Sequence, residues 1–238
     1  RSQGVGVGED EATGWRGKVV KVQSSGGKEE GLELCDPSGE ACKPLARDQA
    51  VPAGSVVRTD ERTRAHLAMA DGTQVGLDRG TRLPLSGETS RRPKLEAGAI
   101  VADVAHKEDQ RAWFGLPKGH VVVLGTKFAL RASEDSTAVD VSRGAVELVD
   151  GEGRKGTVRA GEEGRLFAGM PPYVSSAPAL GEALAWSEST IAEREKDDVV
   201  VRGLGELKAK KPSNDQELSG AVTLTSHKVK VRIAGTIA

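Results

Sequence analysis

The sequence predicts an all-β fold, a solenoid-like or sandwich stack of short strands, followed by one amphipathic helix and a C-terminal β-hairpin. Two observations carry this prediction. Between Trp15 and Val174, short runs of alternating apolar and polar residues recur at intervals of roughly ten residues. Asp71-Gly72 and Asp150-Gly151 stand between such runs, and Asp-Gly is typical of tight hairpin turns. Because no long helical pattern separates the runs, a doubly wound α/β fold is excluded.

The individual strands are predicted from the alternation of Val and Leu with polar residues, taken from the N-terminus onward. In the clearest hairpin, Ala65, Leu67 and Met69 lead into the Asp71-Gly72 turn, and the second arm follows at 75–77. Further strands are predicted around residues 18–23, 55–59, 83–85, 100–104, 113–114, 121–124, 128–131, 139–141, 146–148 and 158.

Four segments divide the chain. Residues 1–14 are polar and rich in Gly, which predicts a flexible arm, and residues 15–174 form the β domain. In residues 175–203, apolar side chains recur at the spacing of an amphipathic helix, which predicts a helical connector. Residues 204–238 return to a β pattern. Their last strand, 227–233, alternates strictly and has a basic face formed by Lys228, Lys230 and Arg232.

The composition argues against two classes of ligand. The 238 residues include 34 Lys and Arg against 35 Asp and Glu, so the net charge is −1, whereas nucleic-acid binding needs a clustered excess of basic residues. Aromatic residues make up only 3% of the chain, so stacking platforms for sugars or single-stranded nucleic acids are scarce. The core is therefore expected to consist of Val, Leu, Ala and Ile.

The two cysteines, Cys35 and Cys42, flank a turn sequence, Asp36-Pro37-Ser38-Gly39. Such a turn brings the two sulfur atoms close together across a hairpin, and we favour a disulfide, which indicates an oxidising compartment. Two unpaired cytosolic thiols are the alternative. A metal site is disfavoured, because two thiolates without a nearby His leave a tetrahedral shell half empty.

The sequence contains no recognisable catalytic arrangement. The four histidines, His66, His106, His120 and His227, do not lie at metal-ligand spacing. Adjacent acids at 134–135, 162–163 and 197–198 are typical of solvated loops and helix ends, and no Gly-x-Ser-x-Gly elbow or phosphate-binding loop is present. We therefore expect a protein that is not an enzyme and uses no cofactor or metal.

The first residue is Arg1 rather than Met, and we expect that a targeting segment preceded it and was removed. No run approaches the roughly 18 consecutive apolar residues that a membrane-spanning helix needs. The disulfide favours a location in an oxidising compartment outside the cytoplasm.

A series of short motifs follows in order from about residue 17 to 168. They are Gly54-Ser55-Val56-Val57-Arg58-Thr59, Ala65-x-Leu67, Asp71-Gly72-Thr73-x-Val75-x-Leu77, Thr81-x-Leu83, Leu95-x-x-Gly98, Val123-Leu124-Gly125-Thr126-x-Phe128, Val139-x-Val141-x-x-Gly144-x-Val146 and Ala160-Gly161-Glu162. In these motifs the chain resembles the FecR-type domain, a module of the bacterial cell envelope. The residues involved are turn formers and strand formers, so the motifs specify a fold rather than a catalytic site.

The FecR resemblance implies a right-handed, solenoid-like stack of strands and a location in the periplasm. In regulators of this family the corresponding region senses a TonB-dependent outer-membrane receptor, and an N-terminal anti-sigma domain and one membrane helix carry the signal inward. This sequence departs from that pattern, since it includes neither the anti-sigma segment nor the membrane helix. The insertion with Cys35 and Cys42 also falls outside the family core.

The C-terminal segment is similar to the start of a VIT domain, a protein-interaction module. The resemblance rests on Gly205-Glu206-Leu207-x-Ala209 and on Leu224-x-x-His227-x-Val229-x-Val231-x-Ile233-x-Gly235-x-x-Ala238. Only the first strands of such a domain are present in 204–238. We expect either that the native chain continues, or that another envelope protein completes this sheet by strand addition.

Three functional hypotheses follow. The first is a non-enzymatic protein-interaction or scaffold module of a periplasmic or secreted bacterial protein, which docks a partner through the basic face of Lys228, Lys230 and Arg232. The second is a carbohydrate-binding β-solenoid, in which Trp113 and Phe114 form a small platform. The third is the periplasmic sensor part of a FecR-like regulator. None of these involves nucleic acid or a direct membrane span.

Overall fold

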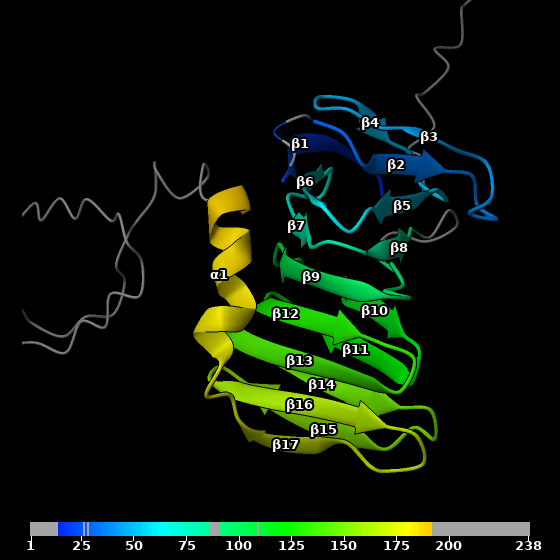
Figure 1. The fold of residues 1–238 in the computed structure, drawn as a ribbon. Coiled ribbons are helices and arrows are strands. Elements are labelled where there is room, and N and C mark those ends of the chain that lie inside the picture. The colour runs from blue at the N-terminus through cyan, green and yellow to red at the C-terminus, as the bar shows by residue number, and fades with distance from the viewer. Residues whose placement is uncertain (1–13, 26, 28, 86–90, 109, 192–238) are drawn as a thin grey trace, which may run out of the picture. The chain divides into compact units, whose positions relative to one another are not determined.

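Alternating apolar residues form seventeen β-strands and one helix in the computed structural model, within the described residues 14–25, 27, 29–85, 91–108 and 110–191 (Figure 1). The strands belong to three antiparallel sheets, here called sheets A, B and C. The nine strands of sheet A are, in spatial order, β17 (Tyr173–Ser176), β16 (Glu162–Phe167), β13 (Ser136–Arg143), β12 (Lys127–Ala132), β9 (Gly98–Asp103), β7 (Gln74–Leu77), β6 (Thr63–Met69), β1 (Gly17–Ser24) and β4 (Ala50–Val51).

Sheets B and C each have four strands. Sheet B contains, in spatial order, β3 (Cys42–Pro44), β2 (Leu32–Cys35), β5 (Val56–Thr59) and β8 (Arg82–Pro84). Sheet C contains β10 (Ala112–Leu116), β11 (Gly119–Val123), β14 (Ala145–Asp150) and β15 (Lys155–Arg159). Figure 1 shows β9, β12, β13 and β16 of sheet A in front of β10, β11, β14 and β15 of sheet C.

One continuous hydrophobic core lies between sheet A and the other two sheets. It is mostly aliphatic, as the composition predicted, and each fully buried Leu or Val in it stabilises the fold by about 1.5–3 kcal/mol. Three aromatic rings are the exception. Phe114 contacts Trp15 and Phe128 edge to face, with ring centroids 5.9 and 5.2 Å apart. A core shared by facing antiparallel sheets makes the described part of the chain a β-sandwich.

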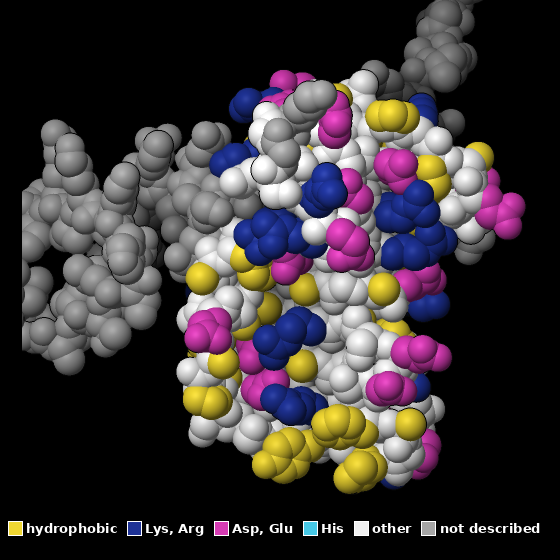
Figure 2. Space-filling model, viewed as in Figure 1, with side chains coloured by type: hydrophobic (Ala, Val, Ile, Leu, Met, Phe, Trp, Pro, Cys, Tyr) yellow, Lys and Arg dark blue, Asp and Glu magenta, His cyan; other side chains and the backbone are white. Residues whose placement is uncertain are grey.

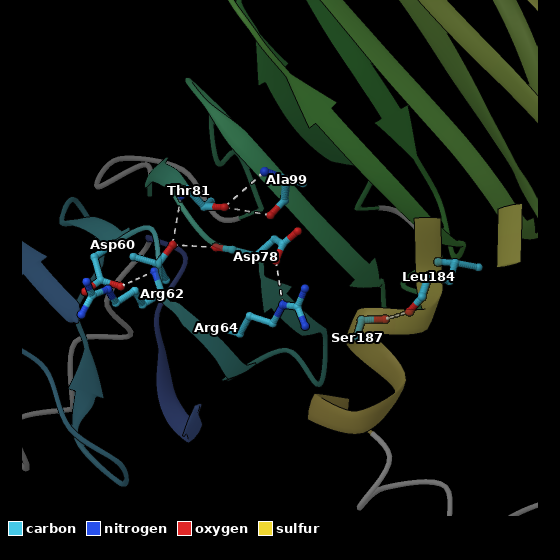
Figure 3. Close-up of polar contacts among 9 residues, drawn as sticks. Asp60, Arg62, Arg64, Asp78, Thr81, Ala99, Leu184 and Ser187 are labelled. Carbon is cyan, nitrogen blue, oxygen red and sulfur yellow. Dashed lines mark hydrogen bonds and ion pairs between the residues drawn. The ribbon is translucent and has the colours of Figure 1, made fainter. Parts of the chain in front are cut away.

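Buried threonine hydroxyls connect the sheets. The Thr59 hydroxyl donates to the carbonyl of Asp78 (2.6 Å) and accepts from the backbone N–H of Thr81 (2.9 Å). The Thr81 hydroxyl in turn donates to the carbonyl of Ala99 in β9 (2.9 Å), a contact drawn in Figure 3. Thr59 and Thr81 therefore join sheet B to sheet A.

Two glycines of the FecR-like motifs are required by backbone geometry. Gly72 has φ 90° in the turn between β6 and β7, a left-handed conformation that the tight hairpin needs. Gly98 has φ 86°, and a Cβ atom there would come within 2.6 Å of the Cα of Thr81. No larger residue fits at Gly98 unless the backbone moves.

The helix α1 (Leu180–Ile191) packs on the outer face of sheet A, where it contacts β6, β7, β12 and β13. Ala183 and Leu184 are buried against Val101 of β9 and Ala129 of β12. Figure 1 shows that α1 runs across the direction of the strands. The predicted helix thus covers one face of the sandwich.

The all-β prediction and the amphipathic helix are confirmed, and the sandwich is the arrangement observed. All pairings between the described strands are antiparallel, whereas the coils of a parallel β-solenoid pair in parallel, so these strands do not show the solenoid. Residues 1–13 of the predicted flexible arm, the end of the helical connector after residue 191, and the whole VIT-like segment 204–238 with its predicted hairpin lie outside the described residues. No helix in the described part of the chain combines the length and apolarity needed to cross a bilayer.

Candidate functional site

The disulfide predicted from the sequence is present between Cys35 and Cys42, which face each other across the β2–β3 pair. The turn between them is ordered by Asp36, whose carboxylate accepts from the Ser38 hydroxyl (2.8 Å) and from the backbone N–H of Glu40 (3.0 Å). These hydrogen bonds, first that of Ser38, hold the pKa of Asp36 below its usual value. Glu33 lies near both sulfur atoms, but the disulfide withdraws the thiolates that a metal site would need.

The predicted platform of Trp113 and Phe114 does not form. Adjacent residues of a strand point to opposite faces of the sheet, and in β10 the ring of Phe114 enters the core with 0% exposure. Phe114 therefore cannot contact a partner. Trp113 lies on the outer face, where the His120 ring stacks on it at 4.4 Å and the Arg92 guanidinium lies 5.1 Å from its centre. The indole, which is partly exposed, thus already contacts two neighbouring side chains.

His120 is held in this stack as a neutral ring more readily than a free histidine would be. Partial burial lowers its pKa, and Lys155 lowers it further, while Glu147 opposes the shift. The side chains of Arg92, Trp113 and His120 thus pack on one another at the surface of sheet C.

A groove beside the start of α1 contains a cluster of four charged side chains from sheet A. The groove has a volume of about 480 Å³ and is lined by β12, β13, β16 and the residues that lead into the helix. In its floor, Asp140 of β13 and Glu163 of β16 stand directly opposite each other, and both are buried. Figure 2 shows basic and acidic side chains alternating beside α1.

Two arginines neutralise this pair of carboxylates. Arg131 of β12 reaches Asp140 (2.8 Å) and Glu163 (3.1 Å), and Arg165 of β16 reaches Glu163 (2.9 Å). Two like charges directly opposite each other on a sheet are destabilising, so the guanidinium groups are needed for the pairing to persist. The pKa of Asp140 is nevertheless raised, first by burial and further by Glu163, against the opposing effect of Arg131 and Arg165.

The groove offers guanidinium groups to any polar group that enters it. Each carboxylate is engaged by an arginine in the folded protein, and the guanidinium groups of Arg131 and Arg165 are half exposed at the surface. Exposed arginines that are already oriented by carboxylates suit the recognition of a polar protein surface. Reasoning from the sequence missed this cluster, because it interpreted Glu162-Glu163 as a solvated loop and could not pair β13 with β16.

A second buried cluster uses a residue of the Asp-Gly turn. Asp71 accepts from the Trp15 indole (3.2 Å) and forms an ion pair with the buried Arg91 (2.9 Å). The Arg91 guanidinium also donates to the carbonyls of Ala105 and Gln110. This cluster is internal, so it fixes loops and offers nothing to a ligand.

The predicted basic face of Lys228, Lys230 and Arg232 lies outside the described residues, as does the VIT-like segment 204–238 that carries it. Docking through this face and completion of a C-terminal sheet by another envelope protein stay predictions.

Comparison with known proteins locates the similarity in the centre of the sandwich. Residues 55–147 match the sequence profile of the family described as FecR protein. This segment is FecR-like. It begins just before β5 and ends within β14, so it includes the Thr59–Thr81 link, both motif glycines and parts of all three sheets. No curated protein matches the chain.

Two crystal structures of candidate anti-sigma factors from Parabacteroides distasonis share the fold. One, at 2.50 Å resolution, is 22% identical, with a TM-score of 0.50 over 56% of this chain and 64% of that one. The other, at 1.65 Å, is 20% identical, with a TM-score of 0.50 over 59% of this chain and 73% of that one. The match therefore spans just under two thirds of the first of these proteins.

Proposed function

We propose that this chain is the protein-binding sensor part of a FecR-like signalling regulator of the bacterial cell envelope. It acts in the periplasm without catalytic activity, and its partner is another envelope protein. The observation that carries the proposal is the FecR match over 55–147, since that segment builds the centre of the sandwich. The fold shared with candidate anti-sigma factors supports the same class of function.

The groove beside α1 is the surface that suits such a partner best. Its arginines are oriented by buried carboxylates, so a partner meets them with little loss of side-chain freedom. The Cys35–Cys42 disulfide supports an oxidising compartment, because such bonds are rarely kept in the cytosol. The carbohydrate alternative is less well supported, since Phe114 is buried and the Trp113 ring already contacts Arg92 and His120.

Photo-crosslinking in the native host tests the proposal. A photoreactive residue is placed at Ser136, which lines the groove, and as a control at Glu40, which is exposed in the disulfide hairpin. We expect one envelope protein to be crosslinked from Ser136 and not from Glu40. The crosslink should weaken in the double variant Arg131→Lys, Arg165→Lys, which keeps the positive charges beside Asp140 and Glu163 but loses the planar guanidinium groups.

Transcript profiling provides the second readout. Deletion of the gene and the double variant should change the same small set of transcripts, because both break one signalling route. Unchanged transcripts together with equal crosslinking from both positions would refute the sensor role.

A further inference from the structure

Sheet A ends at β17, whose outer edge has no neighbouring strand among the described residues. The backbone N–H of Ala177 donates to the carbonyl of Gly161 (2.9 Å), which fixes the alternation of hydrogen bonds along β17. Ser175 and Tyr173 therefore direct their backbone groups toward β16, while Val174 and Ser176 direct theirs outward. An edge of this kind is a template for another strand.

Exposed apolar side chains gather at the same end of the sandwich. Of the large hydrophobic residues that are exposed in the described part of the chain, three belong to β16, β17 or the loop between them: Phe167 (37% exposed), Met170 (57%) and Tyr173 (59%). Figure 2 shows apolar side chains clustered at this lower end, below β16. Contiguous exposed apolar groups of this kind mark an interaction surface.

The lack of charged side chains on β17 favours a second copy of the chain as the strand that pairs with this edge. All four residues of β17 (Tyr-Val-Ser-Ser) are uncharged, so an identical strand placed against it sets no like charges opposite each other. The edge strand of sheet C differs. β15 exposes Lys155 and Arg159, which would repel their own copies. An antiparallel pair of identical strands is self-complementary by symmetry and needs no other matching sequence.

We propose that two copies of this chain form a dimer by antiparallel pairing of β17 with β17, about a two-fold axis at Ser175. In this register Val174 of each copy lies opposite Ser176 of the other, and these two pairs exchange about four backbone hydrogen bonds. In the same register Tyr173, Pro172 and Pro171 lie opposite Ala177, Pro178 and Ala179 of the second copy, so apolar side chains meet apolar side chains.

The prolines around β17 limit the association to a dimer. Pro171 and Pro172 precede the strand and Pro178 follows it, so the ladder cannot extend beyond four residues. Two-fold pairing also consumes the edge, so a third copy finds no free β17. The interface is small, and we expect a dissociation constant in the micromolar range or weaker.

A cysteine at the axis tests the register. Ser175 of the two copies forms a non-hydrogen-bonded pair with Cα atoms about 4.5 Å apart, close enough for a disulfide across the strands. The two native cysteines are already bonded to each other, so no other thiol competes. We expect Ser175→Cys to form a covalent dimer under mild oxidation, and the exposed-turn control Ser133→Cys to stay monomeric under the same conditions.

A proline at the outward position tests the edge itself. Ser176→Pro removes an outward N–H and leaves the hydrogen bonds to β16 intact, whereas Ser176→Ala keeps that N–H. By sedimentation equilibrium, the dimer dissociation constant should rise at least about fivefold in Ser176→Pro and stay unchanged in Ser176→Ala. Circular dichroism verifies that both variants are folded. A wild-type chain that stays monomeric up to about 1 mM, or a Ser176→Pro variant that dimerises as before, overturns the proposal.

Discussion

The hydroxyl groups of two threonines form hydrogen bonds that join sheet B to sheet A. Thr59 and Thr81 are fully buried, and each hydroxyl both donates to a carbonyl and accepts from a backbone N–H. The FecR-like motifs contain these threonines at positions where valine would fit the pleat equally well. The hydroxyl group, and not the β-branch, is what these positions require.

Replacing Thr59 by Val tests this role. The variant keeps the shape but leaves the Asp78 carbonyl and the Thr81 N–H without their partner in the interior. We expect a loss of about 1–3 kcal/mol in the free energy of unfolding, measured by urea titration. Thr157→Val on the exposed side of β15 is the matched control and should change stability by less than about 0.5 kcal/mol. Equal effects in the two variants would mean that the hydroxyl of Thr59 contributes nothing.

Asp140 gives the stability of the fold a specific pH dependence. Because its pKa is raised in the folded state, its contribution is fully present below the ordinary value of 3.8 and is lost as the pH rises through the folded pKa. The variant Asp140→Asn does not titrate. We therefore expect the melting temperature of Asp140→Asn, relative to that of the wild type, to increase from about pH 3.5 to pH 7.

Asp36 supplies a control of opposite sign. Its pKa is lowered, so its contribution is present above the ordinary value of 3.8 and lost as the pH falls through the folded pKa. The melting temperature of Asp36→Asn, relative to that of the wild type, should therefore decrease from about pH 3.5 to pH 7. Parallel curves for the two variants would show that burial of Asp140 beside Glu163 does not control its titration.

At the scale of elements, the disulfide hairpin forms one edge of sheet B. The bond between Cys35 and Cys42 closes a loop with a sequence separation of 7 at the edge of sheet B. In the chain-entropy model, a disulfide that closes so short a loop stabilises the folded protein by about 2.5 kcal/mol. Reduction should lower the free energy of unfolding by this amount and raise the intact mass by two hydrogen atoms.

The control for this hairpin is the double variant Cys35→Ala, Cys42→Ala. Its urea midpoint should be the same with and without reductant. If reductant raises the mass of the wild-type chain but leaves its free energy of unfolding unchanged, the Asp36 turn and not the disulfide orders this hairpin.

Elements formed by neighbours in sequence could be predicted, and those formed by distant segments could not. The β6–β7 hairpin follows from Asp71-Gly72 and local alternation, and the Cys35–Cys42 pair follows from the turn between them. In contrast, β13 pairs with β16 across the intervening hairpin of β14 and β15. Nothing local in the sequence specifies that register, so the Asp140–Glu163 pair and its arginines were not predicted.

The helix illustrates the same limit. Its periodicity predicted an amphipathic element, but its docking site depends on small residues from separate strands. Val101 and Ala129 lie side by side in β9 and β12 and leave room for Ala183 and Leu184. Likewise, alternation placed Trp113 and Phe114 in a strand, and the rule that neighbours point to opposite faces already argues against a shared platform.

At the scale of the whole molecule, the three sheets of the described residues share one continuous hydrophobic core. Buried residues from Trp15 near the N-terminus to Leu166 in β16 belong to one packed cluster, and this cluster includes inner faces of sheets A, B and C. Sheets that share one core lose their packing together. We therefore expect the sandwich to unfold in one cooperative transition, as domains with a single core commonly do.

Two matched substitutions at opposite ends of the core test this cooperativity. Leu32→Ala in sheet B and Leu148→Ala in sheet C each delete a fully buried side chain and should each cost about 2–5 kcal/mol. Because the core is shared, both variants should shift the single transition and keep the same denaturant slope, whether unfolding is followed by far-ultraviolet circular dichroism or by tryptophan fluorescence. A biphasic curve in which Leu32→Ala moves one phase and Leu148→Ala the other would mean that sheets B and C unfold independently over sheet A.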